Sequence, residues 1–189
     1  MSIAAHKLYG PKGIGALYIS SGTKLEKIIT GGYQERNRRA GTENIPAIAG
    51  FAKATELAYS IIHAESQREK ELRDYMETLI LKKIPSVTIN GNLNNRLSNI
   101  SSLTIDNAMA ESILFNLDLR SICISGGSAC SSGTLNPSHV LLALGHDTKM
   151  AKSSIRVSLG KFNTKEDIDE FVKQLELVVE QERNLSDLY

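Results

Sequence analysis

The pattern of apolar and polar positions predicts a short strand and a basic loop near the start of the chain. Apolar residues fill positions 14–19 between two glycine-containing turns, which is typical of a buried strand. The stretch 31–42 has glycine near both ends and three arginines between them, so we expect a positively charged loop there.

A long helix is predicted over residues 46–84, where apolar residues recur every three or four positions. Thr42 and Asn44 are candidate N-caps, and Pro46 suits the first helical turn. The stretch 65–71 is almost wholly polar, so a single helix would be exposed at its middle, as in a helix that bridges two domains. Two shorter helices fit less well, because no Gly or Pro marks a break.

After Pro85 the pattern changes to short strands and short amphipathic helices, which predicts a small α+β unit. The segments with a strand pattern are 87–90, 100–105, 121–125 and 155–159. The segments with a helix pattern are 108–119, 137–144 and 164–182, the last with a Thr-Lys-Glu-Asp start that predicts a cap.

Composition places the protein among ordinary globular proteins: it has 189 residues, 41% of them apolar. Lys and Arg number 22 and Asp and Glu 21, so the net charge of +1 indicates no nucleic-acid or anionic-lipid surface. Two cysteines are too few for a disulfide framework or a structural zinc site, and the histidines lack metal-ligand spacing. No apolar run reaches the roughly 18 residues of a membrane span. We therefore expect a cytoplasmic protein without metal, nucleic-acid or membrane contacts.

Two residues are candidates for covalent chemistry. Lys7 lies between His6 and a Gly-Pro-Lys-Gly turn; it is either a solvated surface lysine or an amine that forms a Schiff base with a carbonyl cofactor. Cys130 lies in a segment rich in Gly and Ser, outside any apolar pattern, which favours a reactive thiolate. Cys123 lies between two isoleucines of a predicted strand, and we interpret it as a buried structural cysteine.

Two further residues are candidates for binding anions. Arg156 lies between Ile155 and Val157 and so points away from their face; it is either an exposed strand residue or a bidentate clamp for a carboxylate. Thr42 is either a plain N-cap or a phosphate ligand at a helix N-terminus. A glycine-rich nucleotide site is not favoured, because neither common glycine-loop motif occurs between a strand and a helix.

Four motifs, at 5–15, 34–46, 127–133 and 154–160, resemble in their order those of cysteine desulfurases of the NifS/IscS type. That family consists of pyridoxal 5'-phosphate (PLP) enzymes with the fold-type I aminotransferase architecture, class V. The resemblance covers essentially the whole chain but matches only the C-terminal half of a family member. Ala4 stands where the family has a phosphate-binding Ser or Thr.

The resemblance implies an α/β fold in three parts. Residues 1–45 would be the remnant of the PLP-binding large domain, 46–84 the long bridging helix, and 85–189 a complete small α+β domain. Met1 would then precede a motif that lies in mid-chain in the family. In the family, the aspartate and the histidine that hold the PLP ring lie before this motif, in a part that these 189 residues do not contain.

The resemblance also implies a role for each candidate residue. Lys7 would bind PLP covalently, His6 would bind its phosphate, and Thr42 would reach the phosphate of the partner subunit's cofactor in a homodimer. Arg156 would hold the carboxylate of the substrate L-cysteine. Cys130 would take the substrate sulfur as a persulfide and leave L-alanine.

The implied acceptor of that sulfur is an iron–sulfur scaffold protein or a sulfur-carrier protein. The implied partners within the enzyme are a second copy of the chain or the missing N-terminal half. The alternative is a catalytically incompetent remnant or split-gene subunit, which folds, dimerises or binds a partner without turnover on its own.

Overall fold

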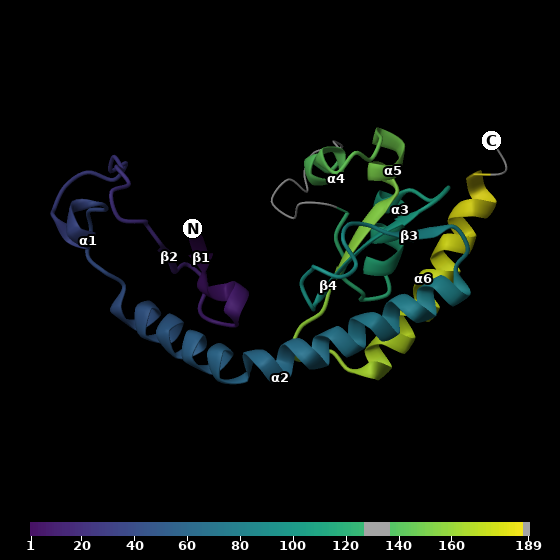
Figure 1. The fold of residues 1–189 in the computed structure, drawn as a ribbon, viewed down its shortest axis with the longest axis horizontal. Helices are drawn as coiled ribbons and strands as arrows, with labels where there is room; N and C mark the ends of the chain where they lie inside the picture. Colours follow the sequence, from purple (N-terminus) through teal and green to yellow (C-terminus); the bar gives the residue numbers. More distant parts are fainter. Residues whose placement is uncertain (127–136, 187–189) are drawn as a thin grey trace. The chain divides into compact units, whose positions relative to one another are not determined.

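The computed structural model describes residues 1–126 and 137–186 (Figure 1). The chain divides into two compact units, Met1–Ile62 and His63–Tyr189, which we call the N-terminal unit and the C-terminal unit. The boundary between the units falls inside a helix. No helix in the described ranges is both long enough and apolar enough to cross a membrane.

Helix α2, Ile45–Lys83, is continuous over 39 residues, as the spacing of apolar residues predicts. Its N-cap is Asn44, whose Oδ1 accepts a hydrogen bond from the Ala47 N–H at 3.2 Å. The polar middle of the helix is exposed only in part, because Glu65, Arg68 and Glu69 are half-buried and the Arg68 guanidinium donates to the Gly160 carbonyl at 3.0 Å. The predicted domain boundaries on either side of this helix stay predictions.

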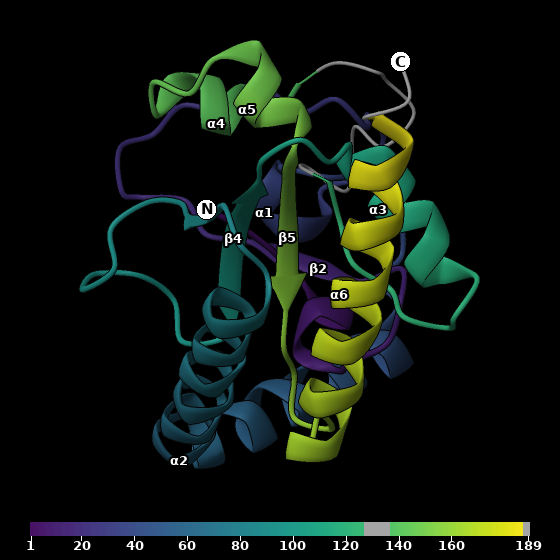
Figure 2. The ribbon, with the colours of Figure 1, turned by 90° about the vertical axis from the view of Figure 1, so that its right-hand side faces the viewer.

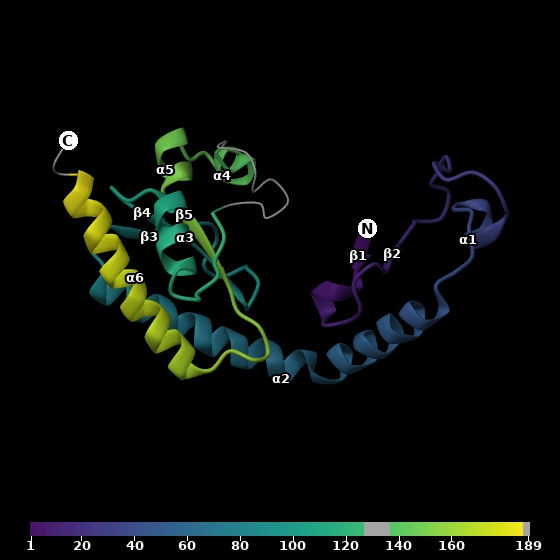
Figure 3. The ribbon, with the colours of Figure 1, turned by 180° about the vertical axis from the view of Figure 1, so that it is seen from behind.

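The N-terminal unit contains a hairpin and two helical turns before α2. These elements are strand β1 Ser2–Ala4, the 3₁₀ turn η1 Ala5–Leu8, strand β2 Gly15–Leu17 and the turn α1 Gln34–Asn37. Strands β1 and β2 pair antiparallel, with Ile3 opposite Ala16 (Figure 3). The prediction of a buried strand over 14–19 is wrong about burial, because all three residues of β2 are exposed. A two-stranded ribbon buries a face only against a second layer.

Turn α1 has left-handed backbone angles, with φ of 51° at Glu35, 56° at Arg36 and 61° at Asn37. Each residue in this conformation costs an L-amino acid roughly 1–2 kcal/mol. Two hydrogen bonds hold the turn: the Asn37 N–H donates to the Tyr33 carbonyl at 3.0 Å, and Lys27 Nζ donates to Asn37 Oδ1 at 2.8 Å. The predicted basic loop therefore contains a hydrogen-bonded turn with a defined backbone conformation.

The C-terminal unit contains a three-stranded antiparallel sheet in the order β3-β4-β5. Strands β4 and β5 lie side by side in Figure 2. Its strands are β3 Val87–Ile89, β4 Ile100–Ile105 and β5 Ser154–Ser158. Its described helices, besides the second half of α2, are α3 Ala110–Asp118, α4 His139–Ala143, α5 Thr148–Lys152 and α6 Lys165–Ser186. The sequence pattern predicts each of these elements except α5.

The predicted strand over 121–125 is wrong. Only one isolated bridge forms there, between Ser125 and Arg156. The Ile122 N–H instead donates to the Leu117 carbonyl at 3.0 Å, which ties the start of this segment to the end of α3. Cys123 is exposed rather than buried, so its interpretation as a structural core cysteine is also wrong.

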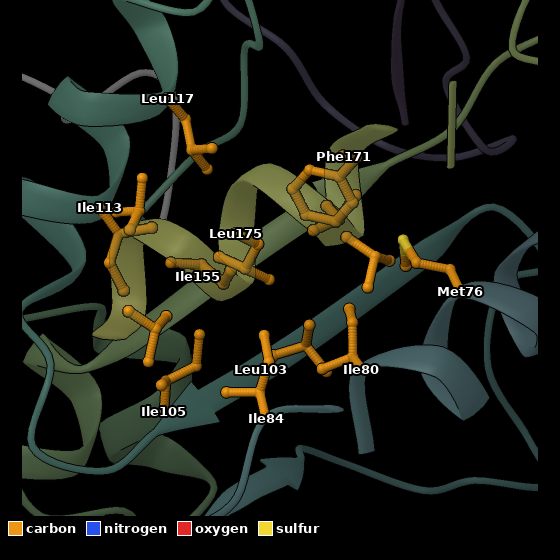
Figure 4. Packing of buried hydrophobic residues seen from close by; sticks show 14 of the residues in the cluster. Met76, Ile80, Ile84, Leu103, Ile105, Ile113, Leu117, Ile155, Phe171 and Leu175 are labelled. Atoms are coloured by element: carbon orange, nitrogen blue, oxygen red, sulfur yellow. The ribbon is translucent and has the colours of Figure 1, made fainter. Parts of the chain in front are cut away.

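Buried apolar side chains from one face of the sheet and from three helices form the core (Figure 4). The sheet contributes alternate residues of β4 and β5, as strand geometry requires. The main contributors are Leu103, Ile105, Ile155 and Val157 from the sheet, Met76 and Ile80 from α2, Ile113 and Leu117 from α3, and Leu175 and Val179 from α6. Full burial of one such side chain contributes about 1.5–3 kcal/mol.

Side-chain caps fix the starts of two helices in this unit. The predicted cap of α6 is confirmed: the Thr164 N–H donates to Asp167 Oδ2 at 2.9 Å, and the Asp167 N–H donates to Thr164 Oγ1 at 3.3 Å. Asp147 Oδ1 accepts from the Met150 N–H at 2.8 Å and so starts α5.

Candidate active site

Lys7 lies in the short turn η1, whose backbone is tied at both ends. The Ala5 N–H donates to the Ile14 carbonyl at 3.1 Å, and the Gly10 N–H donates to the Ala5 carbonyl at 2.9 Å. Ala5 is fully buried, whereas the side chains of His6 and Lys7 are exposed. The turn thus uses one small residue as an anchor and presents an imidazole and an amine to solvent.

Small residues let this turn approach the first half of α2. A Cβ atom built on Gly10 would lie 3.1 Å from the Ala54 Cβ. A Cβ atom built on Gly50 would lie only 2.9 Å from Pro11 Cγ, so a side chain there would push the turn away. Gly50 and Ala54 therefore position Lys7 indirectly. The sequence signal was a Gly and an Ala four residues apart on one helix face, which apolar periodicity alone does not single out.

Thr42 is exposed and lies just before α2, after Gly41, whose φ of 105° suits only glycine. Asn44 fills the N-cap position of α2, so Thr42 is not used as the cap. Among the described residues, its hydroxyl has no hydrogen-bond partner. Thr42 is therefore not the N-cap of α2, and its role as a phosphate ligand stays a prediction.

Arg156 lies in the middle of β5, half-buried, on the face opposite Ile155 and Val157. This direction is the one that the sequence alternation predicts. The Arg156 N–H donates to the Ser125 carbonyl at 2.6 Å, and the Ser125 N–H donates back to the Arg156 carbonyl at 3.1 Å. Its strand is therefore paired on both sides, with β4 and with Ser125.

Cys130, the predicted nucleophile, lies outside the described residues. Cys123 is exposed, and its Sγ lies 3.9 Å from Asp118 Oδ1. His6, Lys7 and Thr42 belong to the N-terminal unit and Arg156 to the C-terminal unit. In the described part of the chain, no group of His, Cys, Asp and Glu side chains is arranged to hold a metal ion.

A family model described as aminotransferase class-V matches residues 1–171. The chain therefore belongs to the class-V aminotransferase family.

Its relatives within that family are cysteine desulfurases. The chain is 48% identical over 186 residues to the cysteine desulfurase IscS of Dictyoglomus turgidum, an alignment that covers 98% of the chain and 47% of the relative. It is 44% identical over 188 residues to the cysteine desulfurase IscS of Methanosarcina thermophila, covering 100% of the chain and 46% of the relative. The chain thus spans about half the length of the curated relatives that it matches.

Solved structures agree with the sequence relatives. A NifS-like protein from Rickettsia africae superposes with a TM-score of 0.83 at 38% identity, covering 95% of this chain and 47% of that one. Another NifS-like protein gives a TM-score of 0.82 at 33% identity, over 95% of this chain and 46% of that one. The predicted fold class, an α/β class-V fold present in part, is confirmed.

The family depends on PLP, and the residues of the N-terminal unit fit this cofactor chemically. Lys7 offers an accessible primary amine, the group with which the aldehyde of PLP would form a Schiff base. His6 is beside it on the same turn, and Thr42 offers a free hydroxyl near the N-terminus of α2, where an anionic phosphate is favoured.

Proposed function

We propose that this chain is the C-terminal portion of a cysteine desulfurase, which takes sulfur from L-cysteine and leaves L-alanine. The observation that carries the proposal is the 48% identity to a cysteine desulfurase over 98% of the chain. The exposed amine of Lys7 and the guanidinium of Arg156 on a paired strand also support it, because an accessible amine and a guanidinium are the groups that this chemistry uses.

The proposed roles are those that the resemblance to cysteine desulfurases implies for each residue. Lys7 binds PLP through its amine, and His6 and Thr42 bind phosphate, Thr42 that of the partner subunit's cofactor. Arg156 binds the substrate carboxylate through two parallel N–H···O bonds, for which guanidinium is better suited than ammonium.

Bound PLP supplies an electron sink for the carbon–sulfur bond that breaks. The Cys130 thiolate forms an S–S bond with the substrate sulfur while the substrate Cβ–S bond breaks. The electron pair of that bond stays with carbon, which takes up a proton and becomes the methyl group of alanine. Cys130 is left as a persulfide.

We propose that the persulfide sulfur passes to an iron–sulfur scaffold or sulfur-carrier protein. The proposed assembly is a homodimer, or an association with an N-terminal half supplied separately. The low cysteine content supports a reducing, cytoplasmic compartment.

The test uses the 189-residue chain mixed with PLP and with the segment of the Dictyoglomus turgidum enzyme that lies outside the matched region. L-Cysteine is added, and alanine and protein-bound persulfide are measured. We expect both products from the wild-type chain, no persulfide from Cys130→Ser, and wild-type amounts from Cys123→Ser, which removes the other cysteine. Persulfide formation by Cys130→Ser would overturn the proposed mechanism.

A second candidate function is a non-catalytic subunit. In that case the chain binds a partner or a second copy without turnover. Absorbance after adding PLP to the chain alone distinguishes the two. An absorbance band that depends on Lys7, together with turnover of cysteine, would exclude the non-catalytic candidate.

A further inference from the structure

The sheet face opposite the core carries Arg156 together with buried polar side chains. Cross-strand pairing places Ser102 opposite Arg156 and Thr104 opposite Ser154. Asn90 follows β3 and extends the same row, because its N–H donates to the Ser102 carbonyl at 2.8 Å. Asn90, Thr104 and Ser154 are 8%, 1% and 2% exposed. Polar groups this deeply buried must be hydrogen-bonded to avoid a large desolvation cost.

These side chains lie in one row across the sheet, each within hydrogen-bonding distance of the next. The Asn90 amide contacts Ser102 Oγ at 3.1 Å and Thr104 Oγ1 at 3.0 Å. Thr104 Oγ1 lies 2.7 Å from Ser154 Oγ. Ser154 Oγ donates to the carbonyl of Met150, the middle residue of α5, at 2.6 Å. The row thus connects the end of β3 with β4, β5 and α5. We call its four residues, Asn90, Ser102, Thr104 and Ser154, the polar row.

We propose that the polar row positions Arg156 for the substrate carboxylate, an inference that rests on the proposed function. A slip of β5 by one residue would exchange its two faces and turn Arg156 toward the core side. Apolar packing also opposes such a slip, because the slip would move Ile155 and Val157 off the core face. Partners fixed at Asn90, Thr104 and Ser154 oppose it directly, because each slipped register leaves buried donors unpaired.

The neighbours of Arg156 connect it to the polar row. Ser102, its direct cross-strand partner, is bonded to Asn90, and Ser154 precedes it by two residues on the same face. Ser125 pairs with Arg156 on the far side of β5. Asn90, Thr104 and Ser154 are thus positioning residues, which act on the substrate only through Arg156.

The experiment compares two identical substitutions on adjacent strands. Thr104→Val removes a buried hydroxyl of the polar row at nearly constant volume. Thr88→Val is the matched control, because Thr88 is exposed and lies directly opposite Thr104 on the same sheet face. In the mixed desulfurase assay we expect Thr104→Val to raise KM for L-cysteine about five- to tenfold, the equivalent of one hydrogen bond, with kcat within about twofold. Thr88→Val leaves both constants unchanged.

Arg156→Lys separates failure of this inference from failure of the proposed function. A KM raised by Arg156→Lys and not by Thr104→Val overturns the positioning role alone. A KM unchanged in Arg156→Lys overturns the carboxylate role, and the inference with it.

A second measurement needs no turnover. Amide hydrogen exchange of the 189-residue chain reports the paired N–H groups of Ser125 and Arg156. We expect Thr104→Val to raise exchange at these two amides by about tenfold more than at core amides of α6, and Thr88→Val to leave them unchanged. Equal changes at all amides in Thr104→Val would show a general loss of stability and overturn the inference.

Discussion

The two units of the chain bury their apolar residues very differently. In the C-terminal unit, large side chains such as Ile80 and Leu175 are fully buried in a single core (Figure 4). In the N-terminal unit the buried apolar residues are alanines, whereas Ile28 is 96% exposed and Tyr33 82% exposed. Side-chain packing therefore stabilises the C-terminal unit, while backbone hydrogen bonds and close contacts of small residues shape the N-terminal one.

This difference matters for the proposed chemistry, because each unit carries part of it. Lys7 depends on a turn held by Ala5 and two glycine contacts, whereas Arg156 depends on a strand embedded in a core. A unit with little buried apolar area has little free energy of unfolding of its own. We therefore expect the carboxylate-binding half of the site to be rigid and the amine-bearing half to be the more easily opened.

The largest expected effect comes from removing the same side chain in each unit. Ile80→Ala leaves a cavity in the core and should lower the free energy of unfolding by about 2–5 kcal/mol. Ile28→Ala removes an exposed side chain and should change it by less than about 0.5 kcal/mol. Urea denaturation followed by circular dichroism measures both. Similar losses in the two variants would mean that the N-terminal unit has a core of its own.

A smaller effect is expected for ion pairs on the two halves of α2. Glu77 is buried, accepts both guanidinium N–H groups of Arg96 at 2.7 and 2.6 Å, and also accepts the Ser101 hydroxyl at 2.6 Å. Glu77→Ala should lower the free energy of unfolding by about 3 kcal/mol, because it leaves the mostly buried Arg96 guanidinium with only the carboxylate of Asp74, 3.9 Å away.

The matched control for Glu77 lies in the N-terminal unit. Glu56 pairs with Lys53 at 2.9 Å, but both side chains are more than half exposed. Glu56→Ala should therefore cost no more than about 0.5 kcal/mol in the same denaturation experiment. A cost as large as that of Glu77→Ala would contradict the contrast between the two halves of the helix.

The smallest effect is a dependence on pH near the start of the C-terminal unit. Hydrogen bonds from Arg68 hold the pKa of Glu65 below its ordinary value of 4.5. Because the folded-state pKa is lowered, this pair stabilises the fold above the ordinary pKa and stops doing so as the pH falls through the lowered value. Wild type should therefore exceed Glu65→Gln in stability at pH 7, and the difference should vanish in acid. A difference that persists in acid would exclude this cause.

The elements of the C-terminal unit could largely be predicted from sequence, because their signals are local. The single helix α2 follows from spacing, and the start of α6 follows from the Thr164 and Asp167 cap. Helix α5, Thr-Lys-Met-Ala-Lys, lacks the run of apolar residues that predicts the equally short α4, and its cap at Asp147 is a weak local signal.

Burial could not be predicted as well, because it depends on what covers a segment. Apolar spacing at β2 predicts a strand correctly but cannot show that no layer covers it. Cys123 alternates with isoleucines, yet its segment follows the end of α3 rather than joining the sheet.

Sequence predicted the residues of the candidate site one by one. It did not predict the contacts that hold these residues in place. The direction of Arg156 follows from alternation within one strand, so sequence suffices for it. The contact between Gly50 and Pro11 and the bond between Thr104 and Ser154 join residues far apart in the chain. Periodicity within one segment carries no information about such pairs.

One measurement tests the central claim most directly: that Lys7 and Cys130, from different parts of the chain, act in one desulfurase reaction. The mixed enzyme is treated with PLP and L-cysteine, and peptide mass spectrometry measures sulfur added to Cys130. We expect Lys7→Ala to abolish the added sulfur, and Lys12→Ala, an exposed lysine of the adjoining turn, to retain it. Undiminished sulfur on Cys130 in Lys7→Ala would contradict the account.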